Sequence, residues 1–277
     1  MSSLDQYSVF GSPIKHSKSP RIHKLFAEQT GQAMQYSAEL VPADQFVQTV
    51  KGFFTQGGQG INCTVPLKEL AWEYADLRTE RAELAKAVNT LALQEDGRVL
   101  GDNTDGVGLV TDLQNNHQIA LKQKRVLILG AGGASRGIIL PILQEAPLTL
   151  TIVNRTVAKA RTLADEFSHK AKINACGYED LAGQSFDLIL NATSASLSND
   201  LPPLAAGILA AGGSCYDLAY ANEATAFVRW AREQQARNSL DGLGMLVEQA
   251  ADAFYLWRGV RPATDPVIQM LEAERNS

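Results

Sequence analysis

Cysteine is scarce in this sequence. The three cysteines, Cys63, Cys176 and Cys215, lie far apart and form no CxxC pair, so they favour neither a disulfide framework nor a zinc site and suit a reducing cytoplasm. The four histidines also lack a metal-binding spacing such as HExxH, which places two ligands on one helix face. We therefore expect a cytoplasmic protein without a metal site.

Positive charge is not in excess either, because 25 Lys and Arg residues stand against 30 Asp and Glu residues and the net charge is -5. Without a basic cluster, nucleic acid is not an expected partner. The N-terminus lacks the basic and apolar pattern of a secretory signal. The longest apolar stretch, 126–143, is broken by glycines and an arginine, whereas a membrane span needs about 20 predominantly apolar residues. We therefore expect no membrane partner.

The chain has 277 residues, of which 45% are hydrophobic and 20% charged. This is ordinary globular composition, and the length favours two domains. Up to about Asp105, strand-like and helix-like segments alternate and then end in a hairpin, which predicts an α/β domain. The expected strands are 7–10, 36–40 and 60–65, the expected helices are 19–30 and 44–56, and the hairpin joins 88–93 to 99–102 through Asp96 and Gly97, which supply positive φ angles.

A second α/β pattern follows, from about Gly106 to Asn238. Its expected elements are helix 107–115, strand 126–129, helix 134–144, strand 148–154, helix 158–167 and strands 186–190 and 214–218. Such alternation predicts a parallel sheet covered by helices. Two further helical stretches, 244–259 and 265–275, are expected to pack back on one of the two domains.

A glycine-rich segment, 130–137, follows an apolar strand and opens an apolar helix. This context is typical of the phosphate-binding turn of a Rossmann-type domain. Gly130 permits the tight turn, Gly132 lets the backbone approach a pyrophosphate, and Ser135 replaces the third glycine where helix meets strand. The alternative is a glycine turn that binds nothing. We expect the phosphates to face the helix N-terminus, at Gly130, Ala131, Gly132, Gly133 and Ala134.

The next strand carries no acid at its end, where NAD-binding domains hold the ribose 2′-hydroxyl with Asp or Glu. It ends instead in Asn154, Arg155 and Thr156, and the guanidinium there can pair with a 2′-phosphate and stack on the adenine. Lys159, one turn into the following helix, can add a second positive charge. An ordinary solvated surface is the alternative, but the missing acid together with Arg155 favours NADP over NAD.

Two serines mark a candidate carboxylate site in the first region. Ser19 precedes Pro20 and is a natural N-cap, which explains it without any ligand. Ser17 is not explained in this way. Two hydroxyls at a helix N-terminus, where the dipole favours negative charge, suit a small carboxylate.

A lysine and an aspartate form a candidate proton-transfer pair. Pro66 is expected in the first turn of a helix, which places the cation of Lys68 near the positive end of the helix dipole. A surface lysine is the alternative. Asp102 and Asp105 lie in a turn-like segment, where Asx-turn or N-cap chemistry competes with a catalytic role. Lys68 and Asp105 end neighbouring elements, and an acid paired with an amine there can poise proton transfer.

Taken together, these residues resemble the shikimate dehydrogenase family. Each motif alone is modest, but the combination is specific and covers nearly the whole chain. The matching segments are Ser17-Lys18-Ser19-Pro20, 62–68, Ala87-Val88-Asn89-Thr90, 101–106, 130–137, Asn154-Arg155-Thr156, Asn191-Ala192-Thr193-Ser194 and 241–246.

The resemblance implies an α/β fold with two domains. A substrate-binding domain is expected at 1–105 and 240–277, and an NADP-binding Rossmann domain with a doubly wound parallel sheet at 106–239. The implied activity is the reversible NADPH-dependent reduction of 3-dehydroshikimate to shikimate, a step of chorismate and aromatic amino-acid biosynthesis. The sequence leaves open whether the chain is a monomer or a homodimer.

The resemblance also implies roles for single residues. Lys68 and Asp105 are the expected catalytic pair, and Ser17 and Ser19 are expected to bind the substrate carboxylate. Ring hydroxyls are expected at Thr64, Asn89, Tyr220 and Gln249. Further cofactor contacts are expected at Thr193, Leu218 and Gly242.

Two positions depart from the family pattern. Cys63 stands where valine or another small apolar residue is frequent, and a buried thiol packs similarly. Ser196 stands where glycine is common, so strain is expected there if that backbone needs positive φ. Two other functions remain open: an NAD-dependent enzyme of the same fold that also accepts quinate, and a non-catalytic sensor of shikimate-pathway metabolites.

Overall fold

The computed structural model describes residues 4–198 and 200–275. The chain divides into two compact units. Unit 1 consists of Met1–Gly108 and Val247–Glu274, and unit 2 of Leu109–Leu246 and Arg275–Ser277. The chain passes from one unit to the other within α5 (Asp105–Thr111) and α9 (Leu243–Arg258), and again at the last residue of α10 (Asp265–Arg275).

Unit 1 contains a mixed sheet. Its strands are β1 (Asp5–Gly11), β2 (Met34–Leu40), β3 (Gly58–Cys63), β4 (Leu77–Arg78), β5 (Thr90–Leu93) and β6 (Val99–Asp102). They are arranged in the order β2-β1-β3-β5-β6-β4. β1 is parallel to β2 and β3, whereas β5 is antiparallel to β3 and β6. The carboxyl ends of β1 and β3 therefore lie at the same edge of the sheet.

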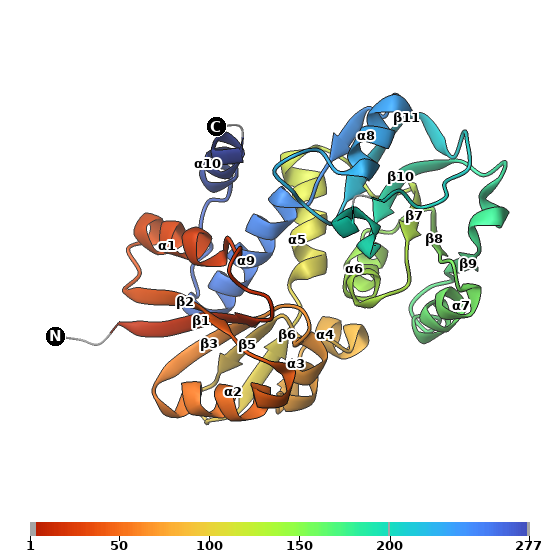
Figure 1. Ribbon diagram of the computed structural model, residues 1–277. Coiled ribbons are helices and arrows are strands. Elements are labelled where there is room, and N and C mark those ends of the chain that lie inside the picture. The colour runs from red at the N-terminus through yellow and green to blue at the C-terminus, as the bar shows by residue number, and fades with distance from the viewer. Residues whose placement is uncertain (1–3, 199, 276–277) are drawn as a thin grey trace. The chain divides into compact units, whose positions relative to one another are not determined.

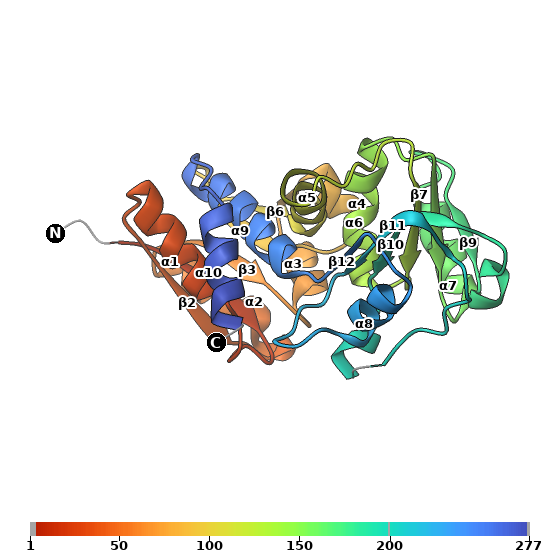
Figure 2. The ribbon, with the colours of Figure 1, turned by 90° about the horizontal axis from the view of Figure 1, so that it is seen from above.

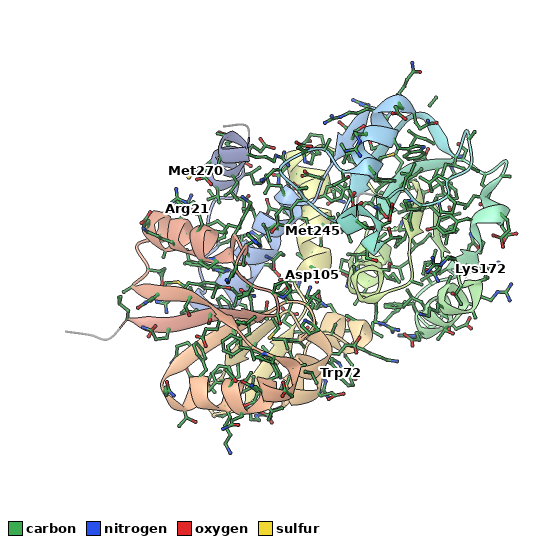
Figure 3. The ribbon with its side chains drawn as sticks, in the orientation of Figure 1. Arg21, Trp72, Asp105, Lys172, Met245 and Met270 are labelled. Atoms are coloured by element: carbon green, nitrogen blue, oxygen red, sulfur yellow. The ribbon has the colours of Figure 1, made fainter. Side chains whose placement is uncertain are left out.

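Helices cover both faces of this sheet. They are α1 (Ser19–Thr30), α2 (Phe46–Thr55), α3 (Lys68–Tyr74), α4 (Glu80–Ala85) and α9, with a short 3-10 turn at Ala43–Gln45. The helix α10 (Asp265–Arg275) lies next to α1 (Figure 1). Figures 1 and 2 show α1 and α9 on one face and α2 on the other. Nη2 of Arg21 in α1 donates to Sδ of Met270 in α10 at 3.2 Å (Figure 3).

The core of unit 1 has two parts. Beneath α2, buried side chains such as Phe10, Phe46 and Leu67 form an apolar cluster, and each such side chain contributes about 1.5–3 kcal/mol on burial. Beneath α1 and α9 the core is aromatic: the ring of His23 stacks on Tyr36 at 4.1 Å between centroids. His23 has no exposed surface, so α1 is fixed over the sheet by an imidazole in an apolar setting.

Unit 2 contains a parallel sheet. Its strands are β7 (Arg125–Leu129), β8 (Thr149–Val153), β9 (Asn174–Cys176), β10 (Phe186–Asn191), β11 (Leu209–Asp217) and β12 (Asn238–Leu240). Their order is β12-β11-β10-β7-β8-β9, and every pairing is parallel. The chain starts at β7, runs outward to β9 and returns to β10, so β7 and β10 form the switch point where open α/β sheets bind ligands.

Three helices of unit 2 follow this winding. They are α6 (Gly133–Gln144), α7 (Val157–Glu166) and α8 (Ala226–Glu233); a π-helical turn lies at Asp112–Asn116, and 3-10 turns lie at Tyr178–Leu181 and Ser194–Ser198. In Figure 1, α6 and α7 lie below the strands of this sheet and α8 above them. Helices on both faces explain why β7 and β10 are almost continuous buried runs of apolar residues.

The predicted fold class, an α/β chain with a doubly wound parallel sheet, is confirmed. Helix 19–30 has the predicted bounds. Two details are wrong: only Gly97 of the hairpin turn has positive φ, and Pro66 precedes α3 instead of lying in its first turn. Strands β4, β9 and β12 were not predicted, because two or three residues are too few to show a period.

Candidate active site

Lys68 is the first residue of α3, directly after the turn that follows β3. The Val65–Pro66 peptide bond in this turn is cis. The carbonyl of Lys68 accepts a hydrogen bond from the amide of Val88 at 2.8 Å, so the backbone of the lysine is fixed next to β5. Its side chain is 30% exposed, which leaves the ammonium open to a ligand and to water.

The structure joins Lys68 and Asp105. Nζ of Lys68 donates to Oδ2 of Asp105 at 2.5 Å, and Nδ2 of Asn89 donates to Oδ1 of the same carboxylate at 2.8 Å. Asp105 begins α5 and is labelled in Figure 3. Its side chain is 16% exposed. Both oxygens are thus held, and the carboxylate is fixed as a partner for the ammonium.

Asn89 is the centre of a wider hydrogen-bond network in unit 1. Its Nδ2 also donates to Thr104 and, at 3.3 Å, to Oε1 of Gln249 in α9. Its Oδ1 accepts from the amide of Thr104 at 2.9 Å. A Cβ added to Gly108 would lie 2.7 Å from the backbone nitrogen of Gln249. The close approach of α5 and α9 at this glycine therefore brings Gln249 to the same network.

The predicted carboxylate ligands lie at the N-terminus of α1. The amide of Ser19 donates to Oγ of Ser17 at 3.3 Å. Ser19 is the first residue of the helix and Lys18 is the N-cap residue, so the expectation that Ser19 is the N-cap is wrong. Thr64 follows β3, and its amide donates to the carbonyl of Phe10 at the end of β1. Both segments leave the same edge of the sheet.

Asp102 does not share the environment of Asp105. Its Oδ1 accepts from Nε of Arg81 at 2.7 Å and from the amide of Asn103 at 2.7 Å. Burial acts to raise the pKa of Asp102, but the hydrogen bonds and charge of Arg81, with help from Thr79 and Asn103, shift it downward overall. Asp102 is therefore a structural carboxylate at the start of the turn that leads to Asp105, although it forms no Asx-turn, because its backbone partner is the amide of the next residue.

In unit 2 the glycine turn lies at the carboxyl end of β7. Gly130 has a φ of +100°. Cβ atoms added at Gly132 or Gly133 would meet no atom within 4 Å, so the backbone at the N-terminus of α6 is open to a ligand. Ser135 is fully buried, and its Oγ donates to the carbonyl of Gly130 at 2.8 Å. A side-chain hydrogen bond thus replaces the close packing that a third glycine gives.

The predicted 2′-phosphate site is exposed. Arg155, Thr156 and Lys159 are exposed at the carboxyl end of β8 and in the first turn of α7. Nδ2 of Asn154 donates to the carbonyl of Thr156 at 2.9 Å, which shapes the turn. Open amides at α6 and two exposed cations beside them fit a phosphorylated dinucleotide.

The remaining predicted cofactor contacts lie beyond β10 and β11. A Cβ on Gly130 would lie 3.1 Å from Cγ2 of Thr193, and one on Gly242 would lie 2.3 Å from the carbonyl oxygen of Leu218. Both glycines therefore permit close backbone approach. Tyr220 belongs to the same unit, and burial raises the pKa of its hydroxyl. Its assignment as a substrate ligand stays a prediction.

Sequence reasoning gave no role to several polar residues that the structure places in these networks. Thr104 bonds to Asn89, and Asn62 donates to the carbonyl of Asn89 at 3.1 Å. Burial raises the pKa of Asp217, while its hydrogen bonds act in the opposite direction. The available signal was position: Asn62 lies near the end of β3, and Asp217 is the last residue of β11.

Among residues 4–198 and 200–275, no three His, Cys, Asp or Glu side chains lie together as a metal site. Within the same residues, no helix is long and apolar enough to cross a membrane.

Three family models match successive parts of the chain. They describe a shikimate dehydrogenase substrate binding domain at residues 9–91, a shikimate / quinate 5-dehydrogenase at 112–198 and a shikimate 5′-dehydrogenase C-terminal domain at 242–272.

Curated relatives match over nearly the whole length. The shikimate dehydrogenase (NADP(+)) of Methylococcus capsulatus is 61% identical over 100% of this chain and 99% of its own. The protein of the same name from Alkalilimnicola ehrlichii is 54% identical over 98% of this chain and 99% of its own.

Solved structures share the fold. An Ael1 enzyme from Pseudomonas putida has a TM-score of 0.91 at 50% identity and covers 96% of this chain and 98% of its own. Shikimate 5-dehydrogenase of Thermus thermophilus, in complex with NADP(H) and shikimate, gives 0.86 at 32% identity over 96% and 98%. The 5-ketofructose reductase of a Gluconobacter strain gives 0.86 at 29% identity over 99% of both chains.

Proposed function

The chain belongs to the shikimate dehydrogenase family, and from this premise we propose that it catalyses the reversible NADPH-dependent reduction of 3-dehydroshikimate to shikimate. The step belongs to chorismate and aromatic amino-acid biosynthesis. The observation that carries the proposal is the ammonium of Lys68 held by the carboxylate of Asp105, which Asn89 fixes in turn.

We assign the substrate to unit 1 and the dinucleotide to unit 2. The match of a substrate-binding family model to residues 9–91 supports the first assignment. The hydroxyls of Ser17 and Ser19 at the N-terminus of α1 suit the substrate carboxylate. In unit 1, Thr64, Asn89 and Gln249 are the proposed partners of the ring hydroxyls. Tyr220, which belongs to unit 2, is a further proposed partner.

The residues of unit 2 fit NADP(H). The open amides at Gly132 and Gly133 suit the pyrophosphate, because the N-terminus of α6 favours anions. Arg155 and Lys159 suit the 2′-phosphate, with Asn154 and Thr156 shaping the turn between them. Further contacts are proposed at Ala131, Ala134, Thr193, Leu218 and Gly242.

Bound NADPH supplies a hydride to the ring ketone. Lys68 hydrogen-bonds the ketone oxygen through Nζ and gives it a proton as negative charge develops there, so the ketone gains one hydride and one proton and becomes an alcohol. Asp105 keeps the ammonium oriented and stabilises its positive charge. Because the lysine side chain is 30% exposed, the proton it loses returns from solvent. General acid catalysis of this kind contributes about 10²- to 10⁴-fold.

The decisive measurement follows NADPH oxidation after addition of 3-dehydroshikimate. Parallel assays use NADH in place of NADPH, and quinate with NADP⁺ in the oxidising direction. A third parallel assay uses 5-ketofructose as the substrate, because the fold is also similar to that of a 5-ketofructose reductase. We expect the highest kcat/KM for 3-dehydroshikimate with NADPH. No turnover in any arm contradicts catalysis and favours a sensor, whereas a preference for NADH and quinate contradicts the cofactor and substrate assignments.

We also propose a cytoplasmic location. Cys63, Cys176 and Cys215 are all free thiols, which suits a reducing compartment. Fractionation of cells that express the tagged chain tests this proposal, and recovery outside the cytoplasmic fraction contradicts it.

A further inference from the structure

A buried carboxylate in unit 2 takes no part in the proposed chemistry. Asp217 is the last residue of β11 and has no exposed surface. Burying a charge is costly unless hydrogen bonds compensate it. Asp217 accepts four: from Oγ of Ser196 at 2.5 Å, Oγ1 of Thr225 at 2.6 Å, Nδ2 of Asn191 at 3.2 Å and the amide of Ala219 at 3.2 Å.

The four donors come from three segments of the chain. Asn191 is the last residue of β10 and Ser196 lies in the turn that follows it, Ala219 follows β11, and Thr225 caps the N-terminus of α8 by accepting from the amide of Val228. Asp217 therefore ties together the loops that leave two neighbouring strands.

These loops carry or contact the cofactor-binding residues predicted beyond β10 and β11, which are Thr193, Leu218 and Gly242. Oδ1 of Asn191 accepts from both the amide and the hydroxyl of Thr193, at 3.2 and 2.7 Å. The amide of Leu218 donates to the carbonyl of Asn191 at 2.9 Å, and the amide of Gly242 donates to the carbonyl of Ala219 at 3.1 Å. Each of these three residues therefore bonds to Asn191 or Ala219, which in turn donates a hydrogen bond to Asp217.

The location fits one end of the dinucleotide. The adenosine end is assigned to the side of β8, where Arg155 lies. A dinucleotide crosses the switch point of a Rossmann-type sheet, so its other end lies over β10 and β11. Thr193 lies against Gly130 of the phosphate turn, which makes the segment after β10 continuous with the pyrophosphate site.

Ser196 links two members of this network, Asn191 and Asp217, through its hydroxyl. Its Oγ accepts from Nδ2 of Asn191 at 2.9 Å and donates to Asp217. The residue lies within the 3-10 turn Ser194–Ser198 and does not have positive φ. Strain, the consequence considered for a serine at this position, is therefore not found, and the side chain forms an added link instead.

We propose that Ser196 is a positioning residue for the cofactor: through Asp217 and Asn191 it holds residues 191–198 in the arrangement that receives the nicotinamide half of NADP(H). This inference rests on the proposed function, because it requires the chain to bind that dinucleotide. Removal of the hydroxyl leaves Asp217 with its three other donors, so the fold is retained while the segment after β10 loses one of its links.

The test compares two ligands of Ser196→Ala by titration calorimetry. NADPH spans both ends of the site, whereas adenosine 2′,5′-bisphosphate reaches only the end at Arg155. We expect the Kd of NADPH to rise about tenfold, the order of magnitude for losing a hydrogen bond to a charged group, and the Kd of the bisphosphate to stay within twofold. In steady-state assays the KM for NADPH rises more than kcat falls.

Two controls make the test specific. Ser168→Ala removes a hydroxyl of the same unit that lies outside residues 191–198 and donates to the carbonyl of Asp165, and should leave both Kd values unchanged. In an Asp217→Asn background, Ser196→Ala should have little further effect, because the serine acts through the carboxylate.

An unchanged NADPH Kd in Ser196→Ala overturns the inference, and so does an equal rise for both ligands, which indicates general loosening of unit 2. Effects that add independently in the double variant overturn the route through Asp217. The failure of the proposed function itself is distinguishable, because the parent protein then binds no NADPH.

Discussion

In unit 1 the polar groups of the candidate site bind one another, whereas the phosphate side of the candidate site in unit 2, at the glycine turn and the end of β8, consists mainly of open backbone and exposed cations. Lys68, Asp105 and Asn89 form a chain of hydrogen bonds. At Gly132 and Gly133 a Cβ would meet nothing within 4 Å. This difference supports the proposed division of labour, in which unit 1 orients the reacting groups and unit 2 binds the phosphates of the cofactor.

Substitutions in the two units should therefore have different consequences. A change to a connected side chain in unit 1 should affect the chemical step, because it disturbs groups that must be oriented in the transition state. A change on the open surface of unit 2 should affect the affinity for the dinucleotide and leave turnover at saturation nearly intact. Steady-state kinetics and equilibrium titration together distinguish these outcomes.

The largest effect is expected for Lys68→Ala. Loss of the proton donor should lower kcat about 10²- to 10⁴-fold, while the Kd of NADPH changes less than about twofold. Stopped-flow assays with 3-dehydroshikimate and fluorescence titration with NADPH measure the two quantities. Lys24→Ala is the matched control, because its side chain is 66% exposed and pairs with Glu28 on α1. Unchanged turnover in Lys68→Ala would remove this lysine from the mechanism.

Arg155→Ala should have the next largest effect. Loss of charge-assisted hydrogen bonds to the 2′-phosphate should raise the Kd of NADPH about 10- to 100-fold and leave that of NADH nearly unchanged. The control is Arg161→Ala, because Arg161 is an exposed arginine within α7, and it should leave both affinities intact. An equal loss for both cofactors would contradict the assignment of the 2′-phosphate to Arg155.

Gly132→Ala, which also changes unit 2, should have a smaller effect on cofactor affinity than Arg155→Ala. The φ of Gly132 is -102° and its surroundings are open, so alanine fits without strain and the free energy of unfolding should stay the same. A methyl group at the open turn should raise the Kd of NADPH about tenfold, because it blocks close approach of the pyrophosphate.

The control for this variant is Gly52→Ala on α2, where the surroundings are equally open. It should increase helix stability slightly and leave the Kd of NADPH unchanged. If Gly132→Ala binds NADPH as the parent does, the pyrophosphate does not lie over this glycine.

Sequence patterns predicted unit 2 better than the networks of unit 1, for a physical reason. The glycine turn and Arg155 are local features, in which strand, turn and helix follow one another directly in the chain. The network around Asn89 includes Gln249, which is far away in the sequence. A local pattern of residues cannot predict such a contact. The approach of α5 to α9 at Gly108 depends on the tertiary fold. Hydrogen-bond partners of Asp217 were missed for the same reason.

The smallest predicted effect is a loss of stability at acidic pH that comes from the buried His23 in the core of unit 1. Burial lowers the pKa of His23 to about 3, against a smaller opposing effect of Asn62, whereas an unfolded histidine has a pKa of about 6.5. The folded state keeps His23 neutral, so its contribution to stability is complete above the unfolded pKa and is lost as pH falls below it. Between about pH 7.5 and 5.5 the loss is about 1 kcal/mol.

Urea unfolding at these two pH values checks this expectation. His23→Phe keeps an aromatic ring next to Tyr36 and removes the titrating group, so the variant should lose about 1 kcal/mol less than the parent on acidification. His169→Gln is the control in unit 2, where the imidazole is exposed and the loss should equal that of the parent. Carboxylates contribute to all three proteins alike and cancel in the comparison. Equal losses in His23→Phe and the parent would contradict the expectation that burial keeps His23 neutral.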